Sequence, residues 1–359
     1  MTEKKNQHYI PKFYLRNFSY QNNKKQIGIF NIDNQLFFQT AKLKTQGSKN
    51  FFYGYDGVIE DHLANIEGLL SKTLNQIIQT REIPKKNSTE HFELLLFVTL
   101  TDLRNPIKVE GMKNNFQEMR NNLLKLDPNV DVNKFVPNPS HDEIVKLLLS
   151  NSVEMTDIIS DLEFKLLINK TNKPFISSDF PIVKYNQFLE QSKWQHSKTG
   201  YGTVGLQVFF PLNYELMLVF FDSGIYKVGD KKKKYLDISN VIDVDSLNTL
   251  QFVNCFETVY FDEKANADYI KRIANVSTKY ARANVTKSTM SYVIKDGENE
   301  KEILEGKQNL MILGSTDCEC NLQITGIKIH ENGKNYKFDS SVVQERKHSK
   351  LLRQNKNYR

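Results

Sequence analysis

Four polar residues stand in apolar or aromatic surroundings, where hydrophobic packing alone does not require them. They are His8 before YIPKFYLRNF, Glu67 in ANIEGLL, Arg104 at the end of LLLFVTLTDLR, and Asp179 after FISS. Histidine titrates near neutrality, so His8 is a candidate acid or base, and Arg104 is a candidate clamp for a phosphate or carboxylate. Asp179 and Glu67 would orient His8 or hold a divalent metal ion. We therefore predict that these four residues are catalytic.

Each of these residues also has a structural explanation. His8 could cap the first helical turn or be a satisfied core histidine. Arg104 could neutralise helix-end carbonyls, because the proline two residues later ends the helix. Asp179 could form a turn with its own backbone, and Glu67 could lie on the polar face of a helix. The sequence leaves both explanations open.

Common catalytic signatures are absent from the sequence. It contains no P-loop, no dinucleotide-binding glycine motif, no serine-hydrolase elbow and no HExxH motif, which argues against those enzyme classes. The cysteines Cys255, Cys318 and Cys320 form neither a paired zinc motif nor a disulfide framework, and they indicate a reducing, cytoplasmic location. With no leader and no membrane-spanning run visible, we expect no membrane partner.

The net charge of +7 admits a polyanion as a partner. Much of the positive excess lies in the run Lys231–Lys234 and in the tail 346–359. Such runs are usually solvated loops or chain ends, but when they bind, nucleic acid or a nucleotide is the expected partner. The sequence identifies no organic cofactor and no oligomeric state.

The spacing of apolar residues predicts the elements that position the four polar residues. A short aromatic helix is expected over 8–18 and two strands over 26–43. Further helices are expected over 57–79, 88–106, 107–126 and 139–161, and later over 243–256 and 263–275. Strands separated by turns are expected from about residue 163 onward.

These elements predict an α+β fold rather than a doubly wound sheet. One domain is expected over 1–275, with a mostly helical part over 1–162 packed on a strand-rich part over 163–275. A small β-rich appendage is expected over 276–345. The residues 346–359 are expected to form a basic, flexible tail because they contain few apolar side chains.

Several distinctive stretches follow one another along the chain. They are HYIPKFYLRNF at 8–18, LRNP at 103–106, FISSDFP at 175–181, FFPLNYELML at 209–218 and DSLNTLQF at 245–252. Over residues 7 to about 275 the chain resembles the bacterial family known as domain of unknown function 4238. The motifs that carry the resemblance are H-Y-x-P-x-F-Y-L-x-x-F, L-R-x-P and F-[IL]-[ST]-S-D-x-P.

The resemblance falls on particular positions of this sequence. They are His8, Pro11, Tyr14, Leu15, Phe18, Glu67, Arg104, Pro106, Ser178, Asp179, Pro181, Pro211 and Asn248. The sequence departs from the family pattern at Asn105, where Thr is common, and at Phe180, where Asn is common. The resemblance implies a shared polar site, with Gln7, Tyr14, Ser178 and Asn248 as candidate substrate-binding residues beside the four candidate catalytic ones.

Two functions from different classes fit these residues. The first is a cytoplasmic effector enzyme, a phosphoester hydrolase or nuclease acting on nucleic acid or a nucleotide, as in a toxin or in phage defence. In that enzyme His8 would move a proton and Arg104 would stabilise developing charge. The alternative is a non-catalytic module that recognises nucleic acid, a small ligand or a partner protein. A side chain at Asp179 that faces His8 would favour the enzyme.

Overall fold

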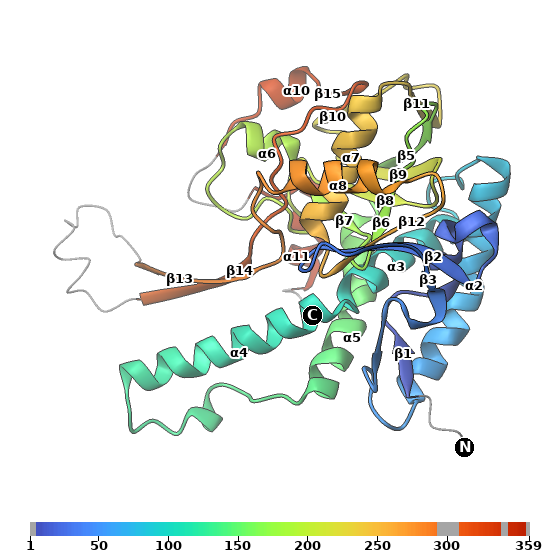
Figure 1. Cartoon of the computed structure of the whole chain (residues 1–359). Helices are drawn as coiled ribbons and strands as arrows, with labels where there is room; N and C mark the ends of the chain where they lie inside the picture. Colours follow the sequence, from blue (N-terminus) through green and yellow to red (C-terminus); the bar gives the residue numbers. More distant parts are fainter. Residues whose placement is uncertain (1–4, 293–308, 339–343, 357–359) are drawn as a thin grey trace.

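The four long helices form near their predicted positions, and three of them begin with a side-chain cap. The computed structural model describes residues 5–292, 309–338 and 344–356, and its helices and strands together form an α+β fold (Figure 1). The helices are α2 (Val58–Thr80), α3 (Thr89–Leu103), α4 (Pro106–Leu126) and α5 (His141–Ile159). Ser88 caps α3, Asn105 caps α4, and Ser140 with Glu143 forms a capping box at α5.

A five-stranded sheet forms the centre of the strand-rich part. Its order is β11 (Tyr235–Ile238), β5 (Glu163–Asn169), β9 (Leu216–Phe221), β8 (Gln207–Pro211) and β7 (Val183–Tyr185). All pairs are antiparallel except β11 with β5, which is parallel. Every residue of β8 and β9 is buried, which explains why these strands read as continuous apolar runs instead of alternating ones.

A second sheet interleaves the two predicted parts of the domain. Its order is β3 (Phe37–Lys42), β2 (Gln26–Asn31), β12 (Thr258–Phe261) and β6 (Ser177–Ser178). The N-terminal hairpin thus pairs with strands from the second half of the chain. The helices α7 (Val241–Asn254) and α8 (Ala267–Ser277) pack against each other beside these strands (Figure 1).

The N-terminal aromatic segment is ordered, although its helix is shorter than predicted. The strand β1 (Asn6–His8) pairs with β4 (Ser48–Asn50), and only α1 (Lys12–Leu15) is α-helical before the 3-10 turn η1 (Arg16–Phe18). The extended backbone of Pro11, with ψ 134°, separates strand from helix. The aromatic side chains of this segment enter the core, as the sequence predicts.

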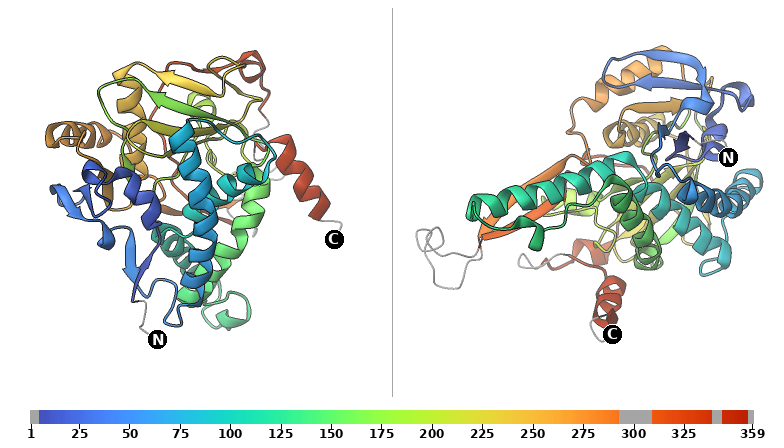
Figure 2. Two further views of the ribbon diagram at one scale, coloured as in Figure 1. Left: turned by 90° about the vertical axis from the view of Figure 1, so that its right-hand side faces the viewer. Right: turned by 90° about the horizontal axis from the view of Figure 1, so that it is seen from below.

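The expected C-terminal appendage is not a separate unit, and this corrects the sequence-based boundary. The strands β13 (Thr286–Tyr292) and β14 (Asn309–Ser315) form a hairpin that projects beside α4 (Figures 1 and 2). The chain then returns to the body, where β15 (Ile327–Ile329) pairs with β10 (Tyr226–Val228). Apolar residues after the hairpin join the core cluster around the five-stranded sheet.

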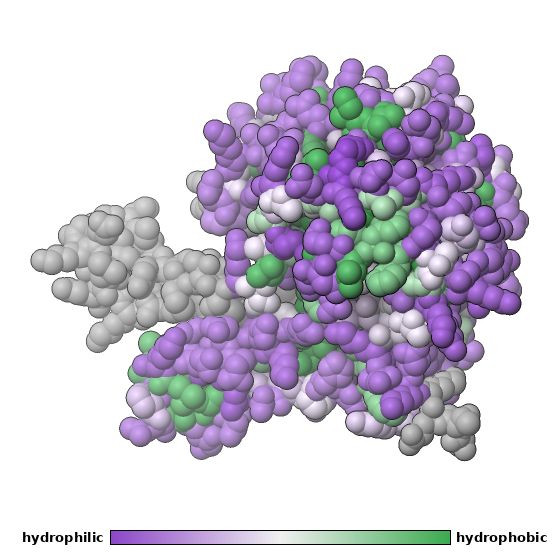
Figure 3. Space-filling view, viewed as in Figure 1, coloured by the Kyte–Doolittle hydropathy of each residue, from purple (hydrophilic) through white to green (hydrophobic). Residues whose placement is uncertain are grey.

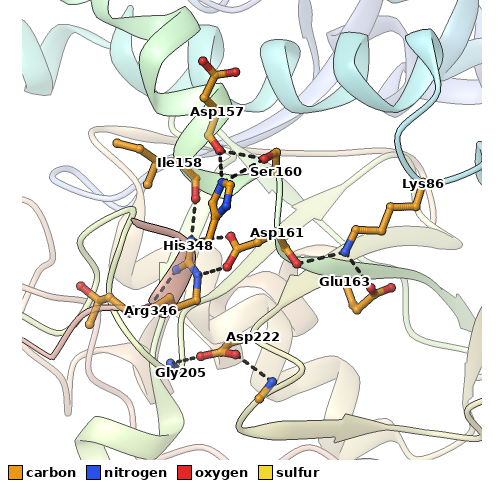
Figure 4. Close-up of polar contacts among 12 residues, drawn as sticks. Lys86, Asp157, Ile158, Ser160, Asp161, Glu163, Gly205, Asp222, Arg346 and His348 are labelled. Carbon is orange, nitrogen blue, oxygen red and sulfur yellow. Dashed lines mark hydrogen bonds and ion pairs between the residues drawn. The ribbon is translucent and has the colours of Figure 1, made fainter. Parts of the chain in front are cut away.

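The expected flexible tail is also corrected by the structure. The segment before α11 (Lys347–Lys356) lies against the body through Arg346, which is only 4% exposed. The Arg346 guanidinium donates to both carboxylate oxygens of Asp161, at 2.8 and 3.0 Å, and to the carbonyls of Ile158 and Thr203 (Figure 4). The basic composition predicts a solvent-exposed, flexible segment, but the four hydrogen bonds of this one arginine hold the segment against the body.

The remaining helical elements are short. They are η2 (Tyr20–Asn22), η3 (Leu43–Thr45), η4 (Val132–Lys134), α6 (Gln187–Gln191) and α10 (Glu331–Lys334).

Leu124, Leu126 and Phe135 are exposed near the far end of α4, where Figure 3 shows an apolar area. Within the described residues, no helix is both long and apolar enough to cross a membrane.

Candidate functional site

Arg104 and Glu67 form an ion pair at the C-terminal end of α3. Arg104 Nη1 lies 2.7 Å from Glu67 Oε1; the arginine side chain is 2% exposed and the glutamate 23%. Burial opposes the charge of Arg104, but Glu67 and Tyr53 together outweigh it, so the pKa of Arg104 is raised. Tyr53 lies near Arg104 and adds to this rise, whereas Arg104 Nε is buried without a hydrogen-bond partner among the described residues. The arginine is therefore held as a cation inside the protein.

His8 joins this pair through Tyr53, which donates its hydroxyl to the His8 carbonyl at 3.1 Å. The His8 ring is 6% exposed, and its Nε2 lies 3.2 Å from the carbonyl oxygen of Lys44. A carbonyl only accepts, so Nε2 carries the proton in this bond. Burial, together with Lys12 and Arg104, lowers the pKa of His8 to about 4. His8 is therefore a neutral donor at pH 7.

Asp179 directs its carboxylate to a different partner, the backbone that follows α7. Its Oδ1 accepts from the N–H of Phe256, and its Oδ2 from those of Glu257 and Thr258, at 2.7 to 2.8 Å. Burial raises the pKa of Asp179 to about 6, while the three N–H donors oppose that rise. The carbonyl of Asp179 accepts from Asn105 at 2.6 Å, so the backbone, not the carboxylate, connects it to the Arg104 region.

The four candidate substrate-binding residues each form internal hydrogen bonds. Gln7 bonds with the backbone of Tyr53 and Gly54, and the Tyr14 hydroxyl bonds with Ser177 and the Pro211 carbonyl. Ser178 donates to Gln251, and Asn248 bonds with the backbone of Pro174 and Ile176 and with Tyr269. Each is almost fully buried, so these side chains join distant chain segments.

The structure therefore brings three of the four predicted catalytic residues together. His8, Glu67 and Arg104 lie around Tyr53, whereas the carboxylate of Asp179 binds the 256–258 backbone. None of the four lines any of five cavities on the described surface. Within the described ranges, no group of three or more His, Cys, Asp or Glu side chains is placed to hold a metal ion.

A cavity of about 500 Å³ lies beside this polar group, and we call it the N-terminal basic cavity. Six of its lining side chains are exposed cations: Lys12, Arg16, Lys24, Lys25, Lys42 and Lys44. The other lining residues are Asn23, Gln26 and Leu43, so no carboxylate lines the cavity. Among the described residues, none of the six cations has an ion-pair partner.

A strained turn positions Lys24 and Lys25. Gln21, Asn22 and Lys24 have φ of 46°, 52° and 59°, a left-handed region that costs roughly 1 kcal/mol or more per non-glycine residue. Side-chain bonds hold the turn. Asn23 Oδ1 accepts from the N–H of Lys25 at 2.9 Å, and the Lys24 N–H donates to the Ser19 hydroxyl at 3.2 Å.

The family's opening motif builds the other side of the same cavity. Lys12 and Arg16 come from the short helical segment that follows Pro11. His8 and Asn6 of β1 both bond with the Lys44 carbonyl, at 3.2 and 3.1 Å. Two cations of the cavity therefore lie within the stretch 8–18, at positions that the motif leaves unspecified, and the histidine of the motif holds the backbone of a third.

Sequence reasoning missed a second buried polar network, centred on Asp102. This carboxylate is fully buried and bonds through Oδ2 with Lys184, at 3.0 Å, and with the Tyr201 hydroxyl. Burial and the charge of Lys184 lower the pKa of nearby Lys108 to about 8. The signal was present in the sequence, because Asp102 is a carboxylate within an apolar helix two residues before Arg104.

The residues of the sequence motifs lie within a region that matches a known protein family, and the description of that family names no function. The model of a family described as "Protein of unknown function (DUF4238)" matches residues 6–265, which confirms the resemblance seen in the sequence. No curated protein and no solved structure gives a significant match. The matched region contains the whole N-terminal basic cavity and ends before β13.

Proposed function

Because the chain belongs to the DUF4238 family, whose description gives no activity, we propose a function from its geometry. The chain is a module that binds nucleic acid through the N-terminal basic cavity. One observation carries this proposal: six cations surround one cavity without a lining carboxylate or an ion-pair partner in the described chain. Their mutual repulsion is unfavourable until an anion neutralises it.

A chain of phosphates fits this arrangement better than a single small anion. All six cations are exposed, so their flexible side chains can follow a backbone that runs past the cavity. Each phosphate contact releases counterions, and this release supplies most of the affinity without sequence specificity. Gln26, whose Oε1 accepts from Asn23 Nδ2 at 3.1 Å, adds amide N–H groups for sugar or phosphate contacts.

The alternative function, a phosphoester hydrolase or nuclease, has weaker support from the geometry. Its proposed base, His8, donates Nε2–H to a carbonyl, and its proposed carboxylate, Asp179, accepts three backbone N–H groups. Both residues are almost fully buried and line none of the five cavities, whereas a catalytic group must reach its substrate. A module that binds nucleic acid could also act in phage defence or as a toxin, and both roles remain part of the proposal.

A reducing cytoplasmic location is part of the same proposal. The three cysteines are unpaired and buried, which is the usual state of thiols in a reducing compartment. Nucleic acid is an abundant polyanion there, so a basic surface of this kind would meet its partner.

Fluorescence anisotropy with a labelled 20-nucleotide single strand tests the proposal. The variant Lys24→Gln/Lys25→Gln/Lys42→Gln removes three of the six charges. We expect its dissociation constant at 0.1 M salt to rise roughly 30- to 100-fold, from the loss of three phosphate contacts. The control Lys113→Gln/Lys125→Gln/Lys146→Gln removes three exposed lysines on α4 and α5. It should bind nearly as tightly as wild type, and equal losses in both variants would refute a localised site.

A further inference from the structure

Glu263 is a carboxylate from the far end of the family region that reaches the strained turn of the N-terminal basic cavity. Its Oε2 accepts the backbone N–H of Gln21 at 2.7 Å, although 242 residues separate the two in the chain. Gln21 begins the left-handed part of the turn that carries Lys24 and Lys25, and its own φ is 46°. This bond therefore joins the turn to the second half of the chain.

The other side-chain bonds of the turn are local. Besides the bond to Lys25, Asn23 Oδ1 accepts from the N–H of Gln26 at 2.8 Å. Left-handed non-glycine residues persist only where the surrounding contacts hold them in place. A hydrogen bond to a carboxylate is stronger than one between neutral groups, so Glu263 is well suited to hold the start of the turn at Gln21.

The register of the second sheet brings Glu263 to this place. The strand β12 pairs with β2 in antiparallel order, with Phe261 opposite Gly28 (Figure 1). The approach is close, because the Phe261 ring lies 2.3 Å from the point where a Cβ on Gly28 would stand. Two residues after this pair on β12 correspond to two residues before it on β2. Glu263 is therefore directed toward Gln26 and the turn that precedes it.

The loop that carries Glu263 is fixed on both sides. The carbonyl of Asp262 accepts from Gln39 Nε2 on β3 at 3.2 Å, and Asp262 Oδ1 accepts from the Lys264 N–H at 3.0 Å. After the loop, the side chain of Asn266 caps α8. The carboxylate of Glu263 thus approaches the turn from a backbone that β12, β3 and α8 hold in place.

Glu263 holds the turn without neutralising the cations of the cavity. It does not line the cavity, and within the described parts of the chain it forms no ion pair. The neighbouring carboxylate, Asp262, is buried and accepts from a backbone N–H. A carboxylate bound to lysines would compete with a phosphate, whereas one bound to an amide leaves the lysines available.

We propose that Glu263 is a positioning residue of the N-terminal basic cavity. It fixes the turn so that Lys24 and Lys25 face the phosphates of a bound strand. This inference rests on the proposed function and adds that the cations of residues 12–44 depend on the loop 262–266. Cations that are already in place lose less conformational entropy when the strand binds.

Two variants at Glu263 separate its bond from its charge. Glu263→Gln keeps an oxygen that can accept from Gln21 but loses the charge, whereas Glu263→Ala loses both. In fluorescence anisotropy with the 20-nucleotide strand, Glu263→Ala should raise the dissociation constant about threefold or more. The magnitude of its salt slope should fall by about 1, because one or two phosphate contacts are lost. Glu263→Gln should bind at least as tightly as wild type.

Asp33→Ala is the matched control, because it removes an exposed carboxylate at the other end of the hairpin formed by β2 and β3. It should bind like wild type. If Glu263 acted only through its charge, Glu263→Gln and Glu263→Ala would tighten binding equally, and this result would overturn the proposal. Unchanged affinity and slope in folded Glu263→Ala would overturn it as well.

Amide hydrogen exchange of Gln21, measured by NMR without the strand, separates this proposal from the proposed function. Exchange should be roughly fivefold or more faster in Glu263→Ala than in Glu263→Gln. Equal exchange in the two variants would overturn the role of Glu263 alone. Failure of the wild-type protein to bind the strand would instead overturn the proposed function.

Discussion

The polar residues that mark the family motifs lie inside the protein, where each has a defined partner. Asp179 accepts three backbone N–H groups, and Arg104 pairs with Glu67. Buried polar groups without partners are costly, so such satisfied groups specify how the segments fit together. In the proposed function, direct contact with an anion falls instead to six exposed cations, which no motif specifies.

Breaking the Arg104–Glu67 pair should reveal its structural role. Glu67→Ala leaves a buried guanidinium without its carboxylate, and we expect the free energy of unfolding in urea to fall by about 3 kcal/mol. Glu67→Met/Arg104→Met removes both charges and should recover most of that loss. The exposed Glu110, 3.5 Å from Lys49, is the control; Glu110→Ala should cost less than about 1 kcal/mol. A loss no larger than the control's would refute the assignment.

The depressed pKa of His8 predicts a pH dependence of stability. The unfolded chain takes up a proton near pH 6.5, whereas folded His8 does so only near 4. The contribution of neutral His8 is therefore present above pH 6.5 and is lost as the pH falls toward 4. His8→Gln keeps a donor for the Lys44 carbonyl but cannot titrate.

The measurement is the difference in unfolding free energy between His8→Gln and wild type. Between pH 6.5 and 4.5 it should shift in favour of the variant by on the order of 1–2 kcal/mol, after an allowance for solvent screening. Because other titrating groups are common to both proteins, the difference isolates His8. The exposed His62→Gln serves as control. A flat difference for His8→Gln would show that its ring is not held neutral.

Residue types in the sequence indicated which positions matter but not what they contact. His8, Glu67 and Arg104 were predicted to share a site with Asp179, and the structure places the first three around Tyr53. The partner of Asp179 is the backbone after α7, more than 70 residues away in the chain, and no local pattern announces such a contact. The predicted catalytic roles remain predictions.

At the scale of elements, apolar periodicity predicted the long helices because each has a buried face, and three of the four begin with a side-chain cap. The same approach failed at the C-terminus, where few apolar residues occur. There Arg346 fixes the chain through Asp161 and two carbonyls, and His348 bonds with the Asp157 carbonyl at 2.9 Å (Figure 4). Composition could not predict this, because the partners come from α5 and the segments beside it.

We predict that Arg346 stabilises the fold. Arg346→Met leaves Asp161 half-buried without its cation and removes four hydrogen bonds, so we expect a loss of about 3 kcal/mol. Arg353, an exposed arginine paired with Glu345, is the matched control. Thermal unfolding of Arg346→Met and Arg353→Met measures the difference. Equal melting temperatures of the two variants would favour the sequence-based prediction of a flexible tail.

At the scale of the whole molecule, the positive charge is gathered at particular places. The net charge is only +7 over 359 residues, yet two cavities concentrate eleven basic side chains, six in the N-terminal basic cavity and five in a cavity that the run Lys231–Lys234 helps to line. The sequence indicated the run Lys231–Lys234 as a concentration of positive charge, but not the N-terminal basic cavity. Its six cations come from three short segments between Lys12 and Lys44, and only folding brings them together.

The salt dependence of single-strand binding tests the central claim most directly. For wild type, six phosphate contacts predict a slope of about −4 in log K against log salt, at roughly 0.7 per contact. Lys24→Gln/Lys25→Gln/Lys42→Gln should lower its magnitude by about 2, with the strand intact in both samples. An unchanged slope in that folded variant would contradict the account, and so would cleavage of the strand that His8→Ala abolishes without weakening binding.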